Sequence, residues 1–127
     1  MKKHPRIMTV DDDQGVLKLL KRVLEPEGYD VIVADNGTVA LKLFEEYMPD
    51  LVILDIMMPG LDGFQVLGLI RQRINVPVIM LSAKREVNTV RDALDLGADD
   101  YVRKPFHTQE LLARVKTKLK RATVSSN

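Results

Sequence analysis

The stretch LVILDIMMPG, residues Leu51–Gly60, raises the question that decides the fold and the function of this chain. Four apolar residues lead directly into Asp55, and three more apolar residues precede a Pro-Gly turn. A continuous apolar run is typical of a strand buried on both faces of a parallel sheet. Because an unpaired buried carboxylate costs several kcal/mol, we expect neighbouring groups to compensate the charge of Asp55 or to use it.

Similar apolar runs alternate with helix-period segments along the chain. The expected strands are Arg6–Val10, Asp30–Ala34, Leu51–Leu54, Val76–Leu81 and Asp100–Arg103. The expected helices cover about residues 14–28, 36–48, 62–73, 85–97 and 108–121. Alternating strands and helices with short connections form parallel βαβ units. We therefore expect an α/β protein, a three-layer sandwich with a five-stranded parallel sheet flanked by five helices.

The composition narrows the class of protein. The chain has 127 residues, the size of one globular domain, with 46% hydrophobic and 29% charged residues. It has no cysteine, which excludes disulfides, thiolate metal sites and cysteine catalysis. The net charge of +1 gives no argument for nucleic-acid or membrane binding, and no apolar run is long enough for a signal peptide or a membrane span. We expect a soluble cytoplasmic protein, with a domain over residues 1–122 and a polar tail or linker stump over residues 123–127.

Polar side chains stand at four of the expected strand ends. They are Asp11–Asp13, Asp55, Ser82 and Lys104. The carboxyl ends of parallel strands lie at one edge of the sheet, where α/β proteins bind their ligands. Carboxylates crowded there repel one another unless a cation intervenes. An all-oxygen donor set without His or Cys favours Mg²⁺, with Mn²⁺ or Ca²⁺ as alternatives.

The same edge carries the parts of a phosphoryl-transfer site. Asp55 is the candidate nucleophile, the ammonium of Lys104 would receive phosphoryl oxygens, and Ser82 would donate a hydrogen bond to them. Each residue also has a simpler structural interpretation. Asp11–Asp13 could cap a helix, Asp55 could form a turn and Ser82 could cap the next helix. Their joint placement favours the site.

Four segments, in order and spacing, resemble the receiver domain of two-component response regulators, which has the CheY-like fold. They are IMTVDDD, LVILDIMMPGLDGFQVL, PVIMLSAK and LGADDYVRKPF. The resemblance extends from Arg6 to about Arg121. It implies a flavodoxin/CheY-like sheet with strand order 2-1-3-4-5.

The resemblance also implies roles for the acidic residues. Asp55 would accept a phosphoryl group from the phosphohistidine of a sensor histidine kinase. Asp12 would bind Mg²⁺ directly and Asp11 through water, and the backbone carbonyl of Met57 would be a further ligand. Asp13 is expected to be peripheral.

A conformational switch is implied as well. Ser82 and Lys104 would bind the phosphoryl oxygens, and the Lys104-Pro105 bond is expected to be cis. When Ser82 shifts towards the phosphoryl group, Tyr101 would turn inward behind it. This would remodel the face made by the fourth helix, fifth strand and fifth helix. Such a domain is regulatory and no enzyme on other substrates, since it catalyses only its own phosphorylation and dephosphorylation.

The sequence says less about the output of the switch. Asp99, Asp100, Glu110 and Arg114 are similar to residues of winged-helix transcription factor receivers, which dimerise through ion pairs across that face. Val90 departs from the pattern, because the group usually has Lys or Arg there. We expect a histidine kinase as partner, a homodimer as an option, and no nucleic-acid or membrane binding by this domain itself.

Two variable positions, Met57 and Lys84, flank the chemistry. Met57 cannot orient an attacking water by hydrogen bonding, which predicts slow self-hydrolysis of an aspartyl phosphate. The alternative functions are a phosphate-independent interaction domain of receiver fold, an aspartate-nucleophile phosphatase and a flavin binder. A phosphatase wants a second Asp where Met57 stands, and the carboxylates of DDDQG would repel the phosphate of a flavin.

Overall fold

A single parallel sheet forms the centre of the protein. The computed structural model describes residues 4–72, 75–83 and 87–125. The strands are β1 (Arg6–Val10), β2 (Asp30–Ala34), β3 (Leu51–Leu54), β4 (Val78–Ser82) and β5 (Asp100–Arg103). They pair in the order β2-β1-β3-β4-β5, and every pairing is parallel. The expected fold class and strand order are confirmed.

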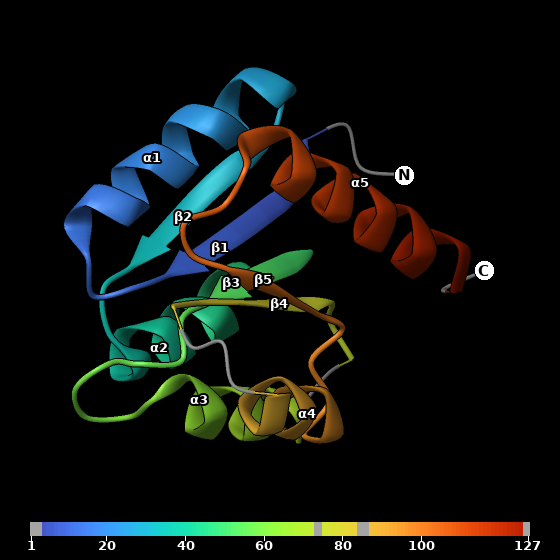
Figure 1. The fold of residues 1–127 in the computed structure, drawn as a ribbon. Coiled ribbons are helices and arrows are strands. Elements are labelled where there is room, and N and C mark those ends of the chain that lie inside the picture. Colours follow the sequence, from blue (N-terminus) through green and yellow to red (C-terminus); the bar gives the residue numbers. More distant parts are fainter. Residues whose placement is uncertain (1–3, 73–74, 84–86, 126–127) are drawn as a thin grey trace.

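The helices cover both faces of this sheet. They are α1 (Gln14–Leu24), α2 (Gly37–Tyr47), α3 (Gly63–Arg71), α4 (Val87–Asp95) and α5 (Thr108–Ser125), with a short 3-10 turn, η1 (Glu25–Glu27), after α1. In Figure 1, α1 and α5 lie on one face, and α2, α3 and α4 lie on the other. Among the described residues, no helix combines the length and the apolar character needed to cross a membrane.

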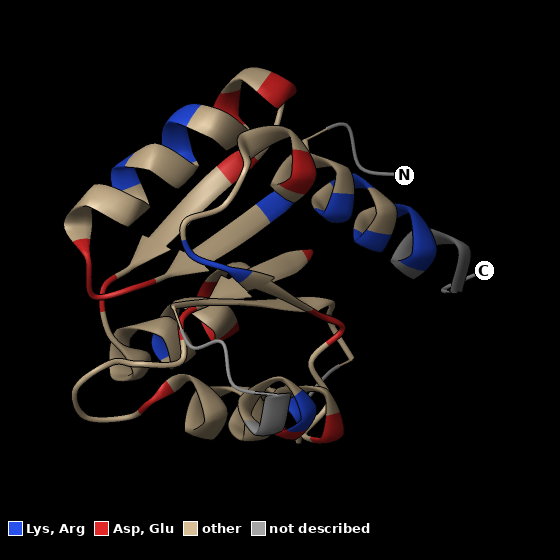
Figure 2. Cartoon of the chain, viewed as in Figure 1, with Lys and Arg blue, Asp and Glu red and all other residues tan. Residues whose placement is uncertain are grey.

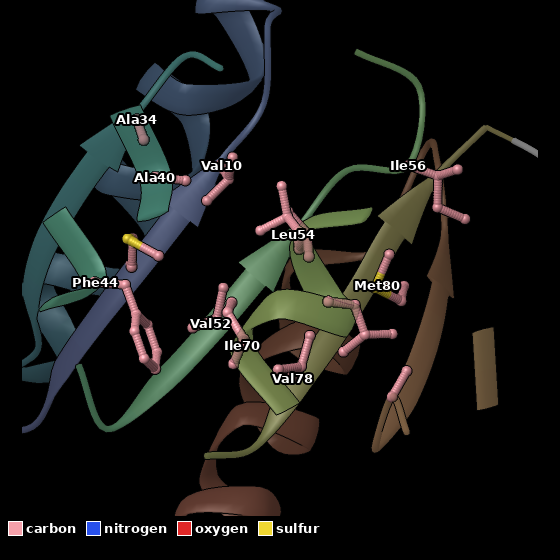
Figure 3. Packing of buried hydrophobic residues seen from close by; sticks show 14 of the residues in the cluster. Val10, Ala34, Ala40, Phe44, Val52, Leu54, Ile56, Ile70, Val78 and Met80 are labelled. Atoms are coloured by element: carbon pink, nitrogen blue, oxygen red, sulfur yellow. The ribbon is translucent and has the colours of Figure 1, made fainter. Parts of the chain in front are cut away.

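The central strand β3 supplies side chains to two hydrophobic layers. Its residues are all at most 1% exposed, because β1 and β4 flank it and helices cover both faces. Leu51 and Ile53 belong to the layer beneath α1 and α5, whereas Val52 and Leu54 belong to the layer beneath α2, α3 and α4. Figure 3 shows this second layer. The apolar run before Asp55 is thus explained by burial on both sides of the sheet.

The boundaries of two elements differ from expectation. Strand β4 begins at Val78 and not at Val76, because Pro77 has no N–H to donate to a ladder. The final helix was expected to end near residue 121, but α5 continues to Ser125, three residues into the expected tail. No Gly or Pro follows Arg121 to end the helix. The domain boundary at residue 122 stays a prediction, and residues 126–127 lie outside the described part.

Polar caps fix where the helices begin at the carboxyl edge of the sheet. The Asp13 carboxylate accepts hydrogen bonds from the N–H groups of Gly15 and Val16, so it is the N-cap of α1. Asp62 and Gln65 form a reciprocal capping box at the start of α3. These caps set how the loops after β1 and β3 enter their helices.

At the opposite edge of the sheet, Arg71 ties the end of α3 to the strands on either side of α4. Its Nε donates to the carbonyl of Gly97 at 2.9 Å, and its Nη1 donates to the carbonyl of Val76 at 2.6 Å. Its Nη2 lies 2.8 Å from Oδ2 of Asp99, which also accepts from the N–H of Val78 at 2.7 Å. The Asp99 carboxylate is therefore engaged within the chain.

One buried hydroxyl in the core leads to a stability prediction. Thr9 is 0% exposed, and among the described residues its Oγ1 is buried without a hydrogen-bond partner. We expect Thr9→Val to raise the free energy of unfolding by about 1 kcal/mol, because the shape is kept while an unsatisfied polar group is removed. Urea denaturation measures the free energy of unfolding. Thr9→Ala, which leaves a cavity, should lower that free energy. A less stable Thr9→Val would contradict the interpretation.

Candidate functional site: an acidic pocket at the edge of the sheet

The predicted site residues meet at one edge of the sheet, where the strands end. Asp11 and Asp12 follow β1, Asp55 follows β3, Ser82 ends β4 and Lys104 follows β5. Figure 2 shows acidic residues just past the end of β1 and basic residues at the end of β5 and just past it. The parallel topology brings together residues that are 93 positions apart in sequence, such as Asp11 and Lys104.

Three carboxylates form the acidic side of the site. Ligand oxygens of Asp11, Asp12 and Asp55 all lie within 4.8 Å of one another. Asp11 is 1% exposed and Asp55 is 4% exposed, whereas Asp12 is exposed. The buried carboxylates of Asp11 and Asp55 therefore lie close together, with the exposed carboxylate of Asp12 beside them.

Lys104 supplies the positive charge of the site. Its Nζ lies 2.7 Å from Oδ2 of Asp11 and 3.5 Å from Oδ1 of Asp55. The Lys104-Pro105 peptide bond is cis, as expected from the resemblance. The backbone N–H of Lys104 donates to the carbonyl of Ser82 at 2.9 Å, so β4 and β5 hold the lysine from the backbone.

The pocket raises the pKa of its buried acid. Burial, followed by the negative charge of Asp11, raises the pKa of Asp55 from 3.8 to about 6, and Lys104 offsets part of this. Burial alone would lower the pKa of Lys104, but its contacts with Asp11 and Asp55 outweigh burial and raise it. Among the described residues the charge of this site is thus poorly balanced, since the ammonium of Lys104 faces three carboxylates.

Ser82 and Tyr101 lie next to each other behind the acidic pocket. Ser82 is fully buried, and Tyr101 is half-buried against the hydrophobic layer beneath α2, α3 and α4. Burial raises the pKa of the Tyr101 phenol, while a side-chain hydrogen bond with Ser82 lowers it in part. The side chains of the two predicted switch residues are therefore in direct contact.

The remaining predicted residues fall at the rim of the site. The Met57 side chain is 57% exposed and lies in the loop after Asp55. Asp13 caps α1, which explains one carboxylate of the triplet as helix capping and agrees with its expected peripheral position. Lys84 lies outside the described residues.

The sequence reasoning did not single out Gly63, which lies against the site. Gly63 is the first residue of α3, and its N–H donates to the carbonyl of Ile56 at 2.8 Å. A Cβ atom there would lie only 2.7 Å from the Cα of Ile56. The signal in the sequence is a glycine directly after a helix N-cap. Other residues fit this position equally well unless another segment of backbone lies close to it, so glycine there indicates such a close approach.

The donor set fits a hard divalent cation. Three carboxylates close together, two of them buried, are stabilised by a positive ion between them, and the described pocket offers oxygen ligands only. Asp12 is the carboxylate open to solvent. Lys104 lies on the opposite side, against Asp11. Asp11, Asp12 and Asp55 are therefore the residues that would hold Mg²⁺.

A matched pair of variants tests the metal site. We expect Asp12→Asn to weaken Mg²⁺ binding about tenfold or more, since a negative charge next to the cation is lost. Asp13→Asn keeps a side chain that caps helices, so Mg²⁺ affinity should stay within about twofold. Isothermal titration calorimetry measures both affinities. Equal losses in the two variants would contradict the assignment.

The raised pKa of Asp55 predicts a pH-dependent effect of Asp55→Asn without Mg²⁺. An acid whose pKa is higher in the folded than in the unfolded state favours folding below its unfolded pKa. That contribution is lost as pH rises through about 6. Asp55→Asn should therefore add little stability at pH 4 and about 1–3 kcal/mol at pH 7. Urea denaturation of both proteins across this range measures the difference, and saturating Mg²⁺ should remove it. A difference independent of pH would contradict the prediction.

Comparison with known proteins places this geometry in a family. The profile described as response regulator receiver domain matches residues 7–116. The DNA-binding response regulator MtrA of Mycolicibacterium paratuberculosis is 46% identical over 116 residues, which cover 91% of this chain and 52% of that protein. The chain thus spans about half the length of the curated relatives it matches.

Solved structures agree with this match. The receiver domain of the Francisella response regulator 1452 is 39% identical, has a TM-score of 0.89, and the match covers 93% of this chain and 98% of that one. A CheY-like receiver domain protein from Methanospirillum hungatei is 31% identical with a TM-score of 0.91, and the match covers 96% and 98%. With its strand order, its acidic pocket and these relatives, the chain belongs to the receiver domain family of two-component response regulators.

Proposed function

We propose that this domain is a phosphorylation-dependent switch, in which Asp55 accepts a phosphoryl group from the phosphohistidine of a sensor histidine kinase. The observation that carries the proposal is the position of Lys104. Its Nζ lies 3.5 Å from Asp55 within a cluster of three carboxylates whose oxygens are at most 4.8 Å apart. A nucleophile, a metal-binding cluster and an ammonium for phosphoryl oxygens are the parts that phosphoryl transfer needs.

The chain's own residues account for the transfer step. One Asp55 carboxylate oxygen forms the bond to phosphorus as the bond from phosphorus to the donor nitrogen breaks. Mg²⁺, when bound, supplies positive charge that offsets the phosphoryl oxygens and the carboxylates. Lys104 exchanges its contact with Asp55 for the phosphoryl oxygens, and the Ser82 hydroxyl donates to them. The domain acts on itself only.

The engaged oxygens of Asp11 support the proposed ligand set. Its Oδ2 lies 2.7 Å from Nζ of Lys104, and its Oδ1 accepts from the N–H of Asp13 at 3.0 Å. Asp11 is therefore better placed to hold the metal through water, while the exposed Asp12 would bind it directly, together with Asp55 and the Met57 carbonyl. Mn²⁺ is the alternative ion, since it shares the oxygen preference of Mg²⁺.

The contact between Ser82 and Tyr101 supports a route for the signal. If Ser82 turns towards a phosphoryl group, its hydrogen bond with Tyr101 is exchanged for a charged acceptor. Tyr101 then repositions, and the face of α4, β5 and α5 changes with it. That face has a pocket lined in part by Tyr101, Arg103, His107, Glu110 and Arg114.

For the output we propose the receiver part of a cytoplasmic transcription regulator, because the curated relatives are named DNA-binding response regulators. The domain itself would bind neither nucleic acid nor membrane. A homodimer through α4, β5 and α5 would have to use residues that are already paired within the chain. Arg114 lies 2.7 Å from Asp100 and 3.0 Å from Glu110, and Asp99 contacts Arg71. Val90 adds no charge to such an interface.

The test of the proposed function is the intact mass of the protein after incubation with acetyl phosphate. With Mg²⁺ we expect the gain of one phosphoryl group, and none with a chelator, because the metal offsets the charge of the site. Asp55→Asn should show no gain, while Asp13→Asn, the matched control outside the site, should gain it. No gain by the wild type would favour the phosphate-independent interaction domain instead.

The exposed Met57 predicts a long-lived phosphorylated form. A thioether side chain cannot position a water molecule for attack on the aspartyl phosphate. We expect Met57→Asn to shorten the lifetime on the order of tenfold, since an amide can orient that water. The decay of the phosphorylated mass after removal of acetyl phosphate measures it, and Met57→Leu is the control expected to keep the lifetime. Equal lifetimes for the Asn and Leu variants would contradict the prediction.

A further inference from the structure

The start of α3 lies directly against the backbone that carries Asp55. A Cβ atom placed on Gly63 would overlap the carbonyl oxygen of Asp55 and would lie 2.7 Å from the Cα of Ile56 and 2.9 Å from the carbonyl carbon of Asp55. Cβ atoms essentially never come this close to other atoms, and the obstructing atoms belong to backbone, which cannot rotate away. Only glycine allows this contact.

The contact is held from the helix side. The N–H of Gly63 donates to the carbonyl of Ile56 at 2.8 Å, and the capping box of Asp62 and Gln65 fixes the first turn of α3. Three residues of α3 are 0% exposed in the hydrophobic layer beneath α2, α3 and α4, namely Val66, Leu67 and Ile70. Because α3 is anchored at its start and along its length, it cannot retreat without losing core packing.

The contact is also held from the strand side. β3 is a fully buried central strand, and the N–H of Asp55 donates to the carbonyl of Val10 at 2.9 Å. The backbone of Asp55 and Ile56 therefore lies between two anchored elements. Any displacement forced by an added methyl group falls on this short segment and on Met57, which follows it.

We propose that Gly63 is a positioning residue of the phosphorylation site. The missing side chain lets α3 lie against Asp55 and Ile56, and this contact sets where the Asp55 carboxylate and the Met57 carbonyl point. The inference rests on the proposed function for the role of these two oxygen groups. It predicts that Mg²⁺ affinity and phosphoryl transfer depend on Gly63 beyond its effect on stability.

Two other glycines provide matched controls. Gly97, at the opposite edge of the sheet, has a φ of +105°, which other residues rarely adopt, and a Cβ atom there would lie 3.1 Å from Nε of Arg71. Gly97→Ala therefore strains the backbone at a position far from the start of α3 and from the acidic pocket. A Cβ atom at Gly68, within α3, would meet nothing within 4 Å. Gly68→Ala therefore tests a methyl group on the same helix without a clash.

The experiment measures three quantities on each alanine variant of Gly63, Gly97 and Gly68. They are urea stability, Mg²⁺ affinity by calorimetry, and the rate of phosphorylation by acetyl phosphate from intact mass. We expect Gly63→Ala to weaken Mg²⁺ binding about tenfold or more and to slow phosphorylation on the order of 10–100-fold. Gly97→Ala should lose stability yet keep Mg²⁺ affinity within about twofold, and Gly68→Ala should keep both.

Equal Mg²⁺ affinity of folded Gly63→Ala and Gly97→Ala would overturn the inference, because Gly63 would then matter for stability alone. If Gly63→Ala does not fold, Gln65→Ala replaces it, since it loosens the start of α3 without adding an atom. A loss of Mg²⁺ affinity in that variant supports the inference, and an unchanged affinity overturns it. Failure of the proposed function is seen separately, as a wild type that binds Mg²⁺ but gains no phosphoryl group.

Discussion

The confinement of negative charge at one edge of the sheet is the constraint on which the site depends. Asp11 and Asp55 are both nearly inaccessible to solvent, and their oxygens lie within 4.8 Å of each other and of Asp12. Lys104 is the ammonium that contacts both buried acids. Such an arrangement is costly without a cation, as the raised pKa of Asp55 shows. It favours the binding of a divalent cation, which would offset the negative charge of the three carboxylates.

The surrounding fold holds that charge in place. Asp55 directly follows the fully buried β3, Asp11 directly follows β1, and Lys104 directly follows β5. All three residues therefore lie at the same edge of the sheet. At Gly63, the start of α3 lies in close contact with the backbone of Asp55 and Ile56. The site is built on short segments between anchored strands and helices, which can hold groups that repel one another close together. The packing of the whole domain offsets the cost of this repulsion.

Much of this organisation follows from local patterns. The apolar run before Asp55 predicted a strand buried on both faces, and the alternation of strands and helices predicted a parallel α/β sandwich. The strand-end positions of Asp11, Asp55, Ser82 and Lys104 then predicted a common site, since parallel strands end at one edge. The boundaries were less predictable. Pro77 delayed β4, and α5 continued past Arg121 because no residue there opposes a helix.

The sequence by itself determined the fold class and which polar residues stand at the strand ends, because periodicity and residue type are local properties. Only the tertiary structure decided how the charges are shared. It pairs Lys104 more closely with Asp11 than with Asp55, and it assigns Asp13 to the cap of α1. It also brings the backbone at Gly63 against that of Asp55. These features depend on distances between segments far apart in the chain, which are set by packing and leave no periodic trace in the sequence.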